Sequence, residues 1–157
     1  MKSYRITDIK KFMGLLFANP TFDEYTLVEA TIKTYCSFNI EGEFDPKFFG
    51  DEADSVEKDR YTKWKRLRPL CTELIKGHNT PLFMKFVFRI DPSQVPSFEN
   101  DGSAESLLFN IRYDGGSLVI TSAVNKSVFT MDKSTDNQWD SIAEAFLVKA
   151  GIGFDEQ

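Results

Sequence analysis

Three long segments of the chain alternate between apolar and polar residues, which is the period of a β-strand with one buried face. The clearest segment runs from Leu82 to Ile90, where every second residue is a large hydrophobic one. The second spans residues 106–124 and is interrupted by Asp114-Gly115-Gly116, a sequence typical of a tight hairpin turn. A chain with this pattern is expected to build a mainly antiparallel sheet.

The third alternating segment, residues 27–44, leaves two interpretations open. Alternation continues from Val28 to Ile40, which is longer than the usual strand of about 5 to 6 residues. That stretch contains no Gly, Pro or Asn-Gly that would mark a turn. The segment is either one long strand with a bend or bulge near Lys33, or two strands joined by a turn that the sequence does not reveal.

Two further segments have the apolar period and the end signals of helices. Residues 9–16 place apolar side chains on one face, and Thr7 or Asp8 is available as N-cap. Residues 135–150 do the same, with Thr135 and Gln138 expected to form a capping box. The fold class predicted from these elements is α+β, with helices packed on one face of a mainly antiparallel sheet in two layers.

A third helix is predicted over residues 69–76. Proline suits the first turn of a helix and disfavours helical geometry in the residue before it, so Pro69 is expected to begin this helix. Residues 61–67 then form a separate short helix or turn, and Gly77 closes the C-terminal end. The residues expected to face inward are Leu70, Cys71, Leu74 and Ile75.

Length and composition fit one α+β domain over residues 1–157, with 15 phenylalanines to fill its core. The acidic segment, residues 41–59, carries eight Asp and Glu against two Lys and is predicted to be a surface loop. Its aromatic residues are expected to fix its first half to the core and leave the rest solvated. They are Phe44, Phe48 and Phe49.

The compartment expected from the sequence is the cytoplasm. The residues after Met1 lack the apolar stretch of a secretory signal, and no apolar run approaches the roughly 18 residues that cross a bilayer. Cys36 and Cys71 lie among apolar neighbours, which indicates two buried thiols in a reducing compartment, with a disulfide between them as the less favoured alternative.

The sequence offers no pattern from which to predict catalytic residues, a metal site or a cofactor. Glycine-rich phosphate loops are absent, and one His with two distant Cys cannot supply a typical zinc shell. A nucleophilic pair of Cys71 and His78 is less favoured than a buried structural thiol.

The candidate site is the basic segment, residues 58–78, which contains seven Lys and Arg and only two acidic residues. Basic residues interleaved with aromatic ones can hold an anion or pack against a partner. The candidate partner- or anion-binding residues are Tyr61, Lys63, Trp64, Lys65, Arg66, Arg68 and His78. In the alternative interpretation, Tyr61 and Trp64 face the core while the charged groups surround them.

The preferred hypothesis is a non-enzymatic intracellular interaction module that binds a protein partner. One alternative is a small enzyme or ligand-binding protein whose pocket the linear sequence does not show. Another is a clamp-like or nucleic-acid-associated protein that uses the basic segment, although a net charge of −5 disfavours nucleic acid as a partner. The oligomeric state stays open.

Three stretches, DIKKFMGLLF, FDEYTLVEATIKTYCSFNIEGEF and WKRLRPLCTELIKGHNTPLFMKFVF, together resemble an uncharacterised family of short bacterial proteins known as a domain of unknown function. The W-x-x-LRP…LIKG-x-x-TP portion is the most specific part. The resemblance implies a stand-alone protein of Gram-positive anaerobes and brings no assigned activity.

The order of the elements is also similar to that of one domain of a DNA sliding clamp. That similarity implies the order β-α-β-β-β-α-β-β-β. A single domain of this kind could encircle DNA only if several copies associated.

Overall fold

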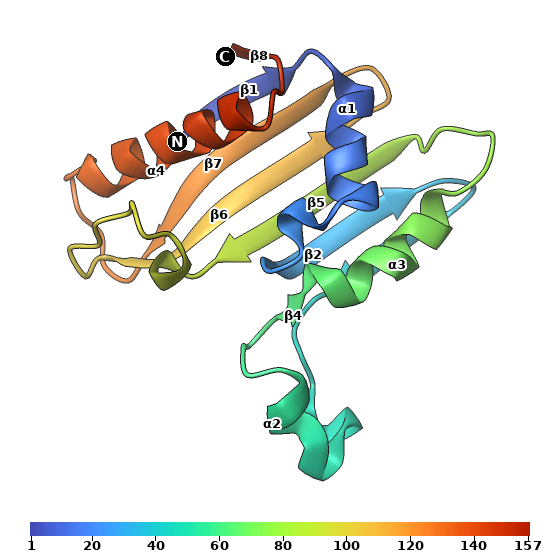
Figure 1. Ribbon diagram of the computed structural model, residues 1–157, viewed down its shortest axis with the longest axis horizontal. Coiled ribbons are helices and arrows are strands. Elements are labelled where there is room, and N and C mark those ends of the chain that lie inside the picture. The colour runs from blue at the N-terminus through green and yellow to red at the C-terminus, as the bar shows by residue number, and fades with distance from the viewer.

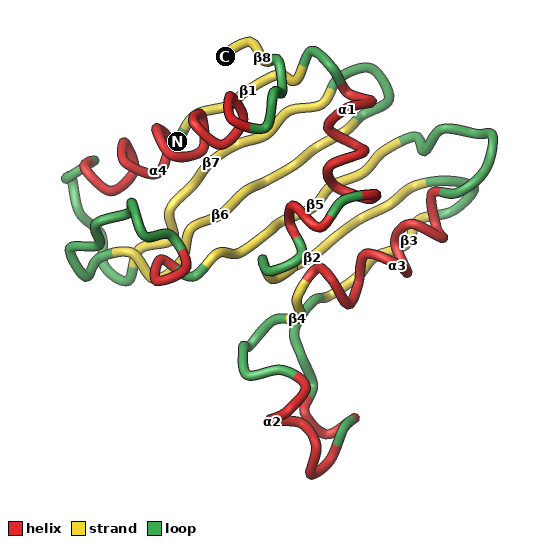
Figure 2. The backbone as a smooth tube through the Cα atoms, viewed as in Figure 1, coloured by secondary structure: helices red, strands yellow, loops and turns green.

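A computed structural model describes residues 1–157 and contains one eight-stranded antiparallel sheet (Figures 1 and 2). The strands follow the order β3-β2-β5-β6-β7-β1-β8, and β4 also pairs with β2. Their bounds are β1 Lys2–Ile6, β2 Thr26–Lys33, β3 Ser37–Glu41, β4 Thr62–Lys63, β5 Phe83–Ile90, β6 Ala104–Tyr113, β7 Leu118–Lys126 and β8 Phe154–Glu156.

Three α-helices lie over the same face of this sheet, which gives the two-layer α+β arrangement predicted from the sequence (Figure 1). They are α1 Ile9–Met13, α3 Trp64–Ile75 and α4 Ser134–Lys149. A fourth helix, α2 Ala53–Val56, lies apart from them (Figure 1). No helix in the chain has both the length and the apolar character that a membrane span needs.

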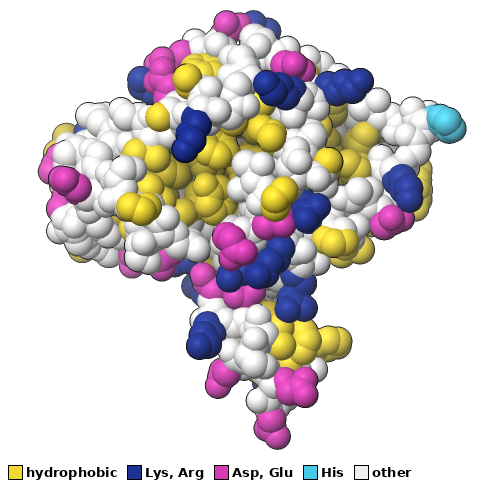
Figure 3. Space-filling model, viewed as in Figure 1, with side chains coloured by type: hydrophobic (Ala, Val, Ile, Leu, Met, Phe, Trp, Pro, Cys, Tyr) yellow, Lys and Arg dark blue, Asp and Glu magenta, His cyan; other side chains and the backbone are white.

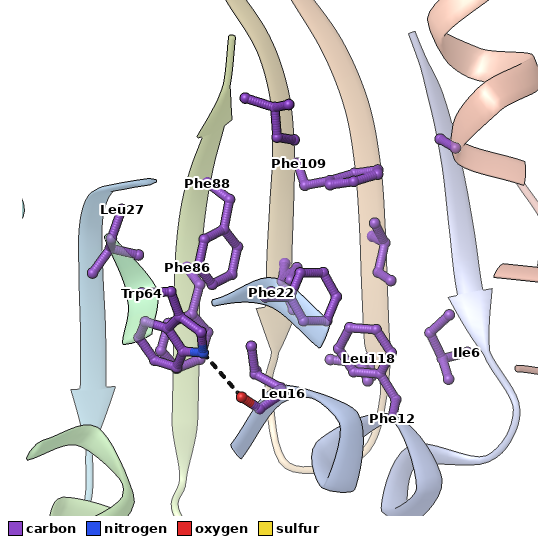
Figure 4. Packing of buried hydrophobic residues seen from close by; sticks show 14 of the residues in the cluster. Ile6, Phe12, Leu16, Phe22, Leu27, Trp64, Phe86, Phe88, Phe109 and Leu118 are labelled. Atoms are coloured by element: carbon purple, nitrogen blue, oxygen red, sulfur yellow. Dashed lines mark hydrogen bonds between the residues drawn. The ribbon is translucent and has the colours of Figure 1, made fainter. Parts of the chain in front are cut away.

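Between the sheet and its helices lies a cluster of 27 buried hydrophobic residues (Figure 4). The strand β5 contributes alternate side chains from Met84 to Ile90, as its period predicts, while Leu82 lies before the strand and is 66% exposed. Phe22 stacks on Phe88 with ring centroids 5.5 Å apart, so the short 3₁₀ turn Pro20–Phe22 is tied to the middle of the sheet.

The predicted hairpin is confirmed by β6 and β7, which pair up to Tyr113 and Leu118. The Asp114 carboxylate accepts hydrogen bonds from the backbone N–H groups of Gly116 and Ser117. Gly115 has a φ of 92°, which residues with a side chain rarely adopt, so the turn requires glycine there.

Residues 27–44 form two strands, so the second of the two interpretations is correct. The strands β2 and β3 pair from Glu29–Glu41 to Lys33–Ser37 and are joined by Thr34, Tyr35 and Cys36. The Thr34 N–H donates to the Cys36 carbonyl oxygen at 3.0 Å. No residue of this turn has a positive φ, so the turn needs neither glycine nor asparagine and has no sequence signal.

The N-terminal helix is α-helical from Ile9 to Met13 and continues as a π-helix from Gly14 to Ala18. Of the two N-cap candidates, Asp8 is the one used, because its side chain accepts from the Lys11 N–H. The helix α4 lies where it was predicted, but the capping box is wrong. Thr135 lies within the helix and not at its N-cap, and its side chain is buried. The Gln138 side chain forms hydrogen bonds with the backbone of Glu99 instead.

The helix α3 begins at Trp64, so the predicted start at Pro69 is wrong. The N–H groups of Trp64 and Lys65 donate to the carbonyl oxygens of Tyr25 and Asp23, so two N–H groups of the first turn are satisfied from outside the helix. These contacts and the burial of Trp64 outweigh the cost of an internal proline, about 3 kcal/mol.

Two side chains lie differently from the prediction. Leu70 is 51% exposed, because it lies on the outer side of α3, whereas Cys71 beside it is buried. Cys36 is exposed, because it lies in the turn between β2 and β3 rather than within a strand. Both cysteines are free thiols.

Candidate functional site

The sheet edge next to β2 is interrupted, and a protrusion leaves it at the gap. The strands β3 and β4 pair with successive parts of β2, and the chain between them is inserted at the break. The two arms of the insert pair with each other through a bridge between Glu43 and Tyr61. We call residues 43–61 the protrusion. It carries α2 and extends away from both layers (Figure 1).

The neck of the protrusion is the point where the chain leaves and rejoins the sheet edge, at Gly42 and Thr62, and it depends on Gly42. Its N–H donates to the Val28 carbonyl oxygen at 2.8 Å, at a bulge where the pairing of β2 with β5 shifts register. Its carbonyl oxygen accepts from the Thr62 N–H at 2.7 Å. A Cβ atom at this position would lie 1.7 Å from the Leu27 carbonyl oxygen, so only glycine fits.

The protrusion carries an aromatic surface, which we define as Phe44, Phe48, Phe49 and Arg66. Phe49 stacks on Phe44 at 5.7 Å and meets Phe48 edge to face at 5.1 Å. The Arg66 guanidinium, from the first turns of α3, lies over the Phe49 ring at 5.4 Å. Phe48 is 85% exposed. The expectation that these rings fix the acidic segment to the core is therefore wrong.

The physical reason is the pairing of the two arms. Because residues 43–44 bond to residues 60–61, the chain leaves the sheet edge before it can fold back over the core. Its phenylalanines then pack on one another and on Arg66. Hydrophobic side chains gather on one side of the protrusion, with acidic groups around them (Figure 3).

Within the basic segment, three of the candidate cations already have carboxylate partners. Arg68 Nε and Nη2 donate to the two carboxylate oxygens of Asp23 at 2.8 and 3.0 Å, and this bonding raises the pKa of Arg68. Lys63 and Lys65 both pair with Glu24, at 3.1 and 3.5 Å. The hydrogen bond from Lys63 lowers the pKa of Glu24.

The aromatic residues of the basic segment divide between core and surface. Trp64 is fully buried, and its Nε1–H donates to the Leu16 carbonyl oxygen at 2.9 Å (Figure 4). Its ring is therefore unavailable to a partner. Tyr61 is half-buried, with the guanidinium groups of Arg60 and Arg89 at 5.2 and 6.0 Å from its ring centroid. Of the predicted site residues, Arg66 is the one that joins the aromatic surface.

His78 lies elsewhere, in the loop that follows α3. This loop and the turn between β2 and β3 enclose a depression of about 360 Å³, which we call the α3-end depression. Its apolar lining is Tyr35, Leu74, Ile75 and Leu82, and its polar lining is Thr34, Lys76, Gly77, His78, Asn79 and Thr80. The Thr34 Oγ1 atom is buried and has no hydrogen-bond partner. This depression has no continuous sequence signal, because its walls lie about 40 residues apart.

Burial raises the pKa of the Cys71 thiol to about 12 and that of the Tyr4 hydroxyl to about 12. Cys71 therefore stays protonated at neutral pH, which is unsuited to a nucleophile paired with His78. No group of three or more His, Cys, Asp or Glu side chains is placed to hold a metal ion.

A family model described as a family of unknown function (DUF5721) matches residues 15–155. The chain belongs to this family. The match runs from the π-helical part of the N-terminal segment into β8, so it includes the protrusion and α3. Searches among curated proteins and solved structures gave no match, and the similarity to a sliding-clamp domain stays a prediction.

Proposed function

We propose that this protein is a non-enzymatic interaction module that binds a protein partner through the aromatic surface. The observation that carries the proposal is the exposure of Phe48, 85%, on a protrusion whose phenylalanines lie outside the core cluster. Clustered exposed aromatic residues favour partner binding, because covering them removes apolar area from water.

Arg66 supports the same surface. Arginine and aromatic residues are enriched at interface centres and dominate the binding energy there. Because Arg66 is anchored on α3 and its guanidinium lies over Phe49, part of the surface is held in place before a partner arrives. The two free cysteines favour a reducing, intracellular compartment for this interaction.

The alternatives have weaker support. A nucleic-acid surface needs unpaired cations, whereas Lys63, Lys65 and Arg68 pair with carboxylates and the acidic segment lies beside them. A small-ligand or enzyme function would centre on the α3-end depression, which contains one imidazole and one unpartnered hydroxyl.

The test is site-specific photocrosslinking from position 48 in cells that express the protein. Phe129 provides a matched control, because it is 91% exposed and lies in the loop between β7 and α4. We expect a discrete protein adduct from position 48 that position 129 does not form, and expect Arg66→Ala to weaken it. Equal, diffuse adducts from both positions would count against the proposed function.

A further inference from the structure

We propose that one partner of the protrusion is a second copy of this chain, whose α3-end depression receives the Phe48 ring. This inference rests on the proposed function and identifies a partner for the same surface. It joins two features that the fold leaves unused: an exposed aromatic side chain and a depression without an occupant from its own chain.

Size and lining favour an aromatic occupant. The depression, at about 360 Å³, lies near the lower end of the range of roughly 300–1,000 Å³ for pockets that take small ligands. Leu74, Ile75 and Leu82 supply apolar walls, and the Tyr35 ring, largely exposed, stands at the rim. A phenylalanine ring can pack against these groups edge to face or stacked.

The charges of the two surfaces are complementary. Phe48 is flanked along the chain by Asp45, Asp51 and Glu52, with Lys47 beside it and the Arg66 guanidinium over the neighbouring Phe49 ring. The lining of the depression contains Lys76 and His78 and no acidic residue, although Glu73 pairs with Lys76 at 3.6 Å. Opposite charges around an apolar anchor steer two surfaces together and set their orientation.

Thr34 lines the depression and carries an unpartnered hydroxyl. Buried side-chain oxygens normally have a hydrogen-bond partner, and Thr34 Oγ1 is the buried side-chain atom of this chain that lacks one. The turn beside the depression thus contains a polar group whose hydrogen bond is not made within this chain.

The two surfaces cannot meet within one copy. Arg66 marks the protrusion end of α3 and Ile75 the depression end, and nine residues of helix separate them by roughly 13 Å. The protrusion also projects away from the layer that holds α3 (Figure 1). The contact therefore joins two copies, either reciprocally in a two-fold dimer or from one copy to the next in a ring or an open chain.

The experiment is sedimentation velocity over micromolar to millimolar protein concentrations. The wild type is compared with Phe48→Ser, which lacks the ring, and with Leu82→Glu, which places a charge at the wall of the depression. Both positions are exposed, so folding should be retained and is checked by circular dichroism. His78→Glu is a second depression variant, and Phe129→Ser is the control for loss of an exposed ring elsewhere.

The wild type and Phe129→Ser should associate as concentration rises. Each single variant should associate roughly tenfold more weakly or worse, because it removes a central anchor or its pocket. An equimolar mixture of Phe48→Ser and Leu82→Glu should form a 1:1 heterodimer that does not grow, because each variant keeps the surface that the other lacks.

The inference is overturned if the wild type stays monomeric, if Phe48→Ser associates like the wild type, or if the mixture stays monomeric. These results leave the proposed function intact when position 48 still crosslinks to another protein. If position 48 also forms no specific adduct, the proposed function fails with it.

Discussion

Arg68 binds both carboxylate oxygens of Asp23 while its Nη1–H donates to the Phe17 carbonyl oxygen at 3.3 Å. One guanidinium thus joins α3 to the two short segments that precede β2. Bidentate charge-assisted bonds of this kind fix orientation as well as distance. A cation that the sequence suggests as a binding residue is therefore engaged in holding the helix layer together.

Arg68→Met should lower the free energy of unfolding by about 1–2 kcal/mol, because it leaves the partly buried Asp23 without its donor. Arg66→Met, on the same helix but without a carboxylate partner, should change it by less than about 0.5 kcal/mol. Urea denaturation of both variants measures the difference. Equal effects would mean that the pair with Asp23 contributes little.

Gly42→Ala should lower the free energy of unfolding by about 1–3 kcal/mol or more. The added methyl group collides with the Leu27 carbonyl oxygen, so the neck must shift. Gly14→Ala is the matched control. Position 14 is helical with open space around it, so alanine there should stabilise the fold by about 0.4–1 kcal/mol. Thermal unfolding of the two variants checks the opposite signs. Destabilisation by both would contradict the role given to the neck.

Trp64→Phe should lower the free energy of unfolding by about 2–4 kcal/mol, because it opens a cavity and leaves the Leu16 carbonyl oxygen without its donor. The variant should still bind through the aromatic surface once it is folded. Denaturation measured alongside photocrosslinking from position 48 separates the two effects. A folded variant with normal stability and no adduct would place Trp64 in the site instead of the core.

The thiols should differ in reactivity. In the native protein Cys36 should react quickly with a thiol reagent, and Cys71 should react only when the protein unfolds, because Cys36 is exposed and Cys71 is buried. Cys36→Ser should abolish rapid labelling and Cys71→Ser should leave it unchanged. Rapid labelling of two thiols in the native state would show that Cys71 is accessible.

Stability should fall as the pH rises from about 9 towards 12. The pKa of Cys71 is about 12 in the folded protein against an ordinary value of 9.0, so in this range the unfolded chain loses a proton that the folded chain keeps. Tyr4, raised from 10.0 to about 12, adds to the loss at the upper end of the range. Denaturation of the wild type and Cys71→Ala between pH 8 and pH 11 tests this. The variant should lose less stability over that interval, and parallel curves would contradict the assignment.

The regular strands were predictable because their signal is local. The alternation in β5 reflects one buried and one open face, and Asp114-Gly115-Gly116 supplies the conformation that its turn needs. The turn at Thr34–Cys36 was not predictable, because ordinary residues suffice to make it. The start of α3 was missed because Tyr25 and Asp23, about 40 residues away, supply its first hydrogen bonds.

The α+β class, the antiparallel sheet and most of the core positions could be predicted from the residue pattern, since burial on one face of a strand or helix imposes a period on the residues. Which charges are paired and which aromatic rings are exposed depends instead on contacts between distant segments of the chain. Trp64 and Phe48 look alike in the sequence, as large rings beside charged residues. One is covered because Leu16 and β5 meet it from distant parts of the chain, and the other is exposed because the paired arms of the protrusion carry it away from the core.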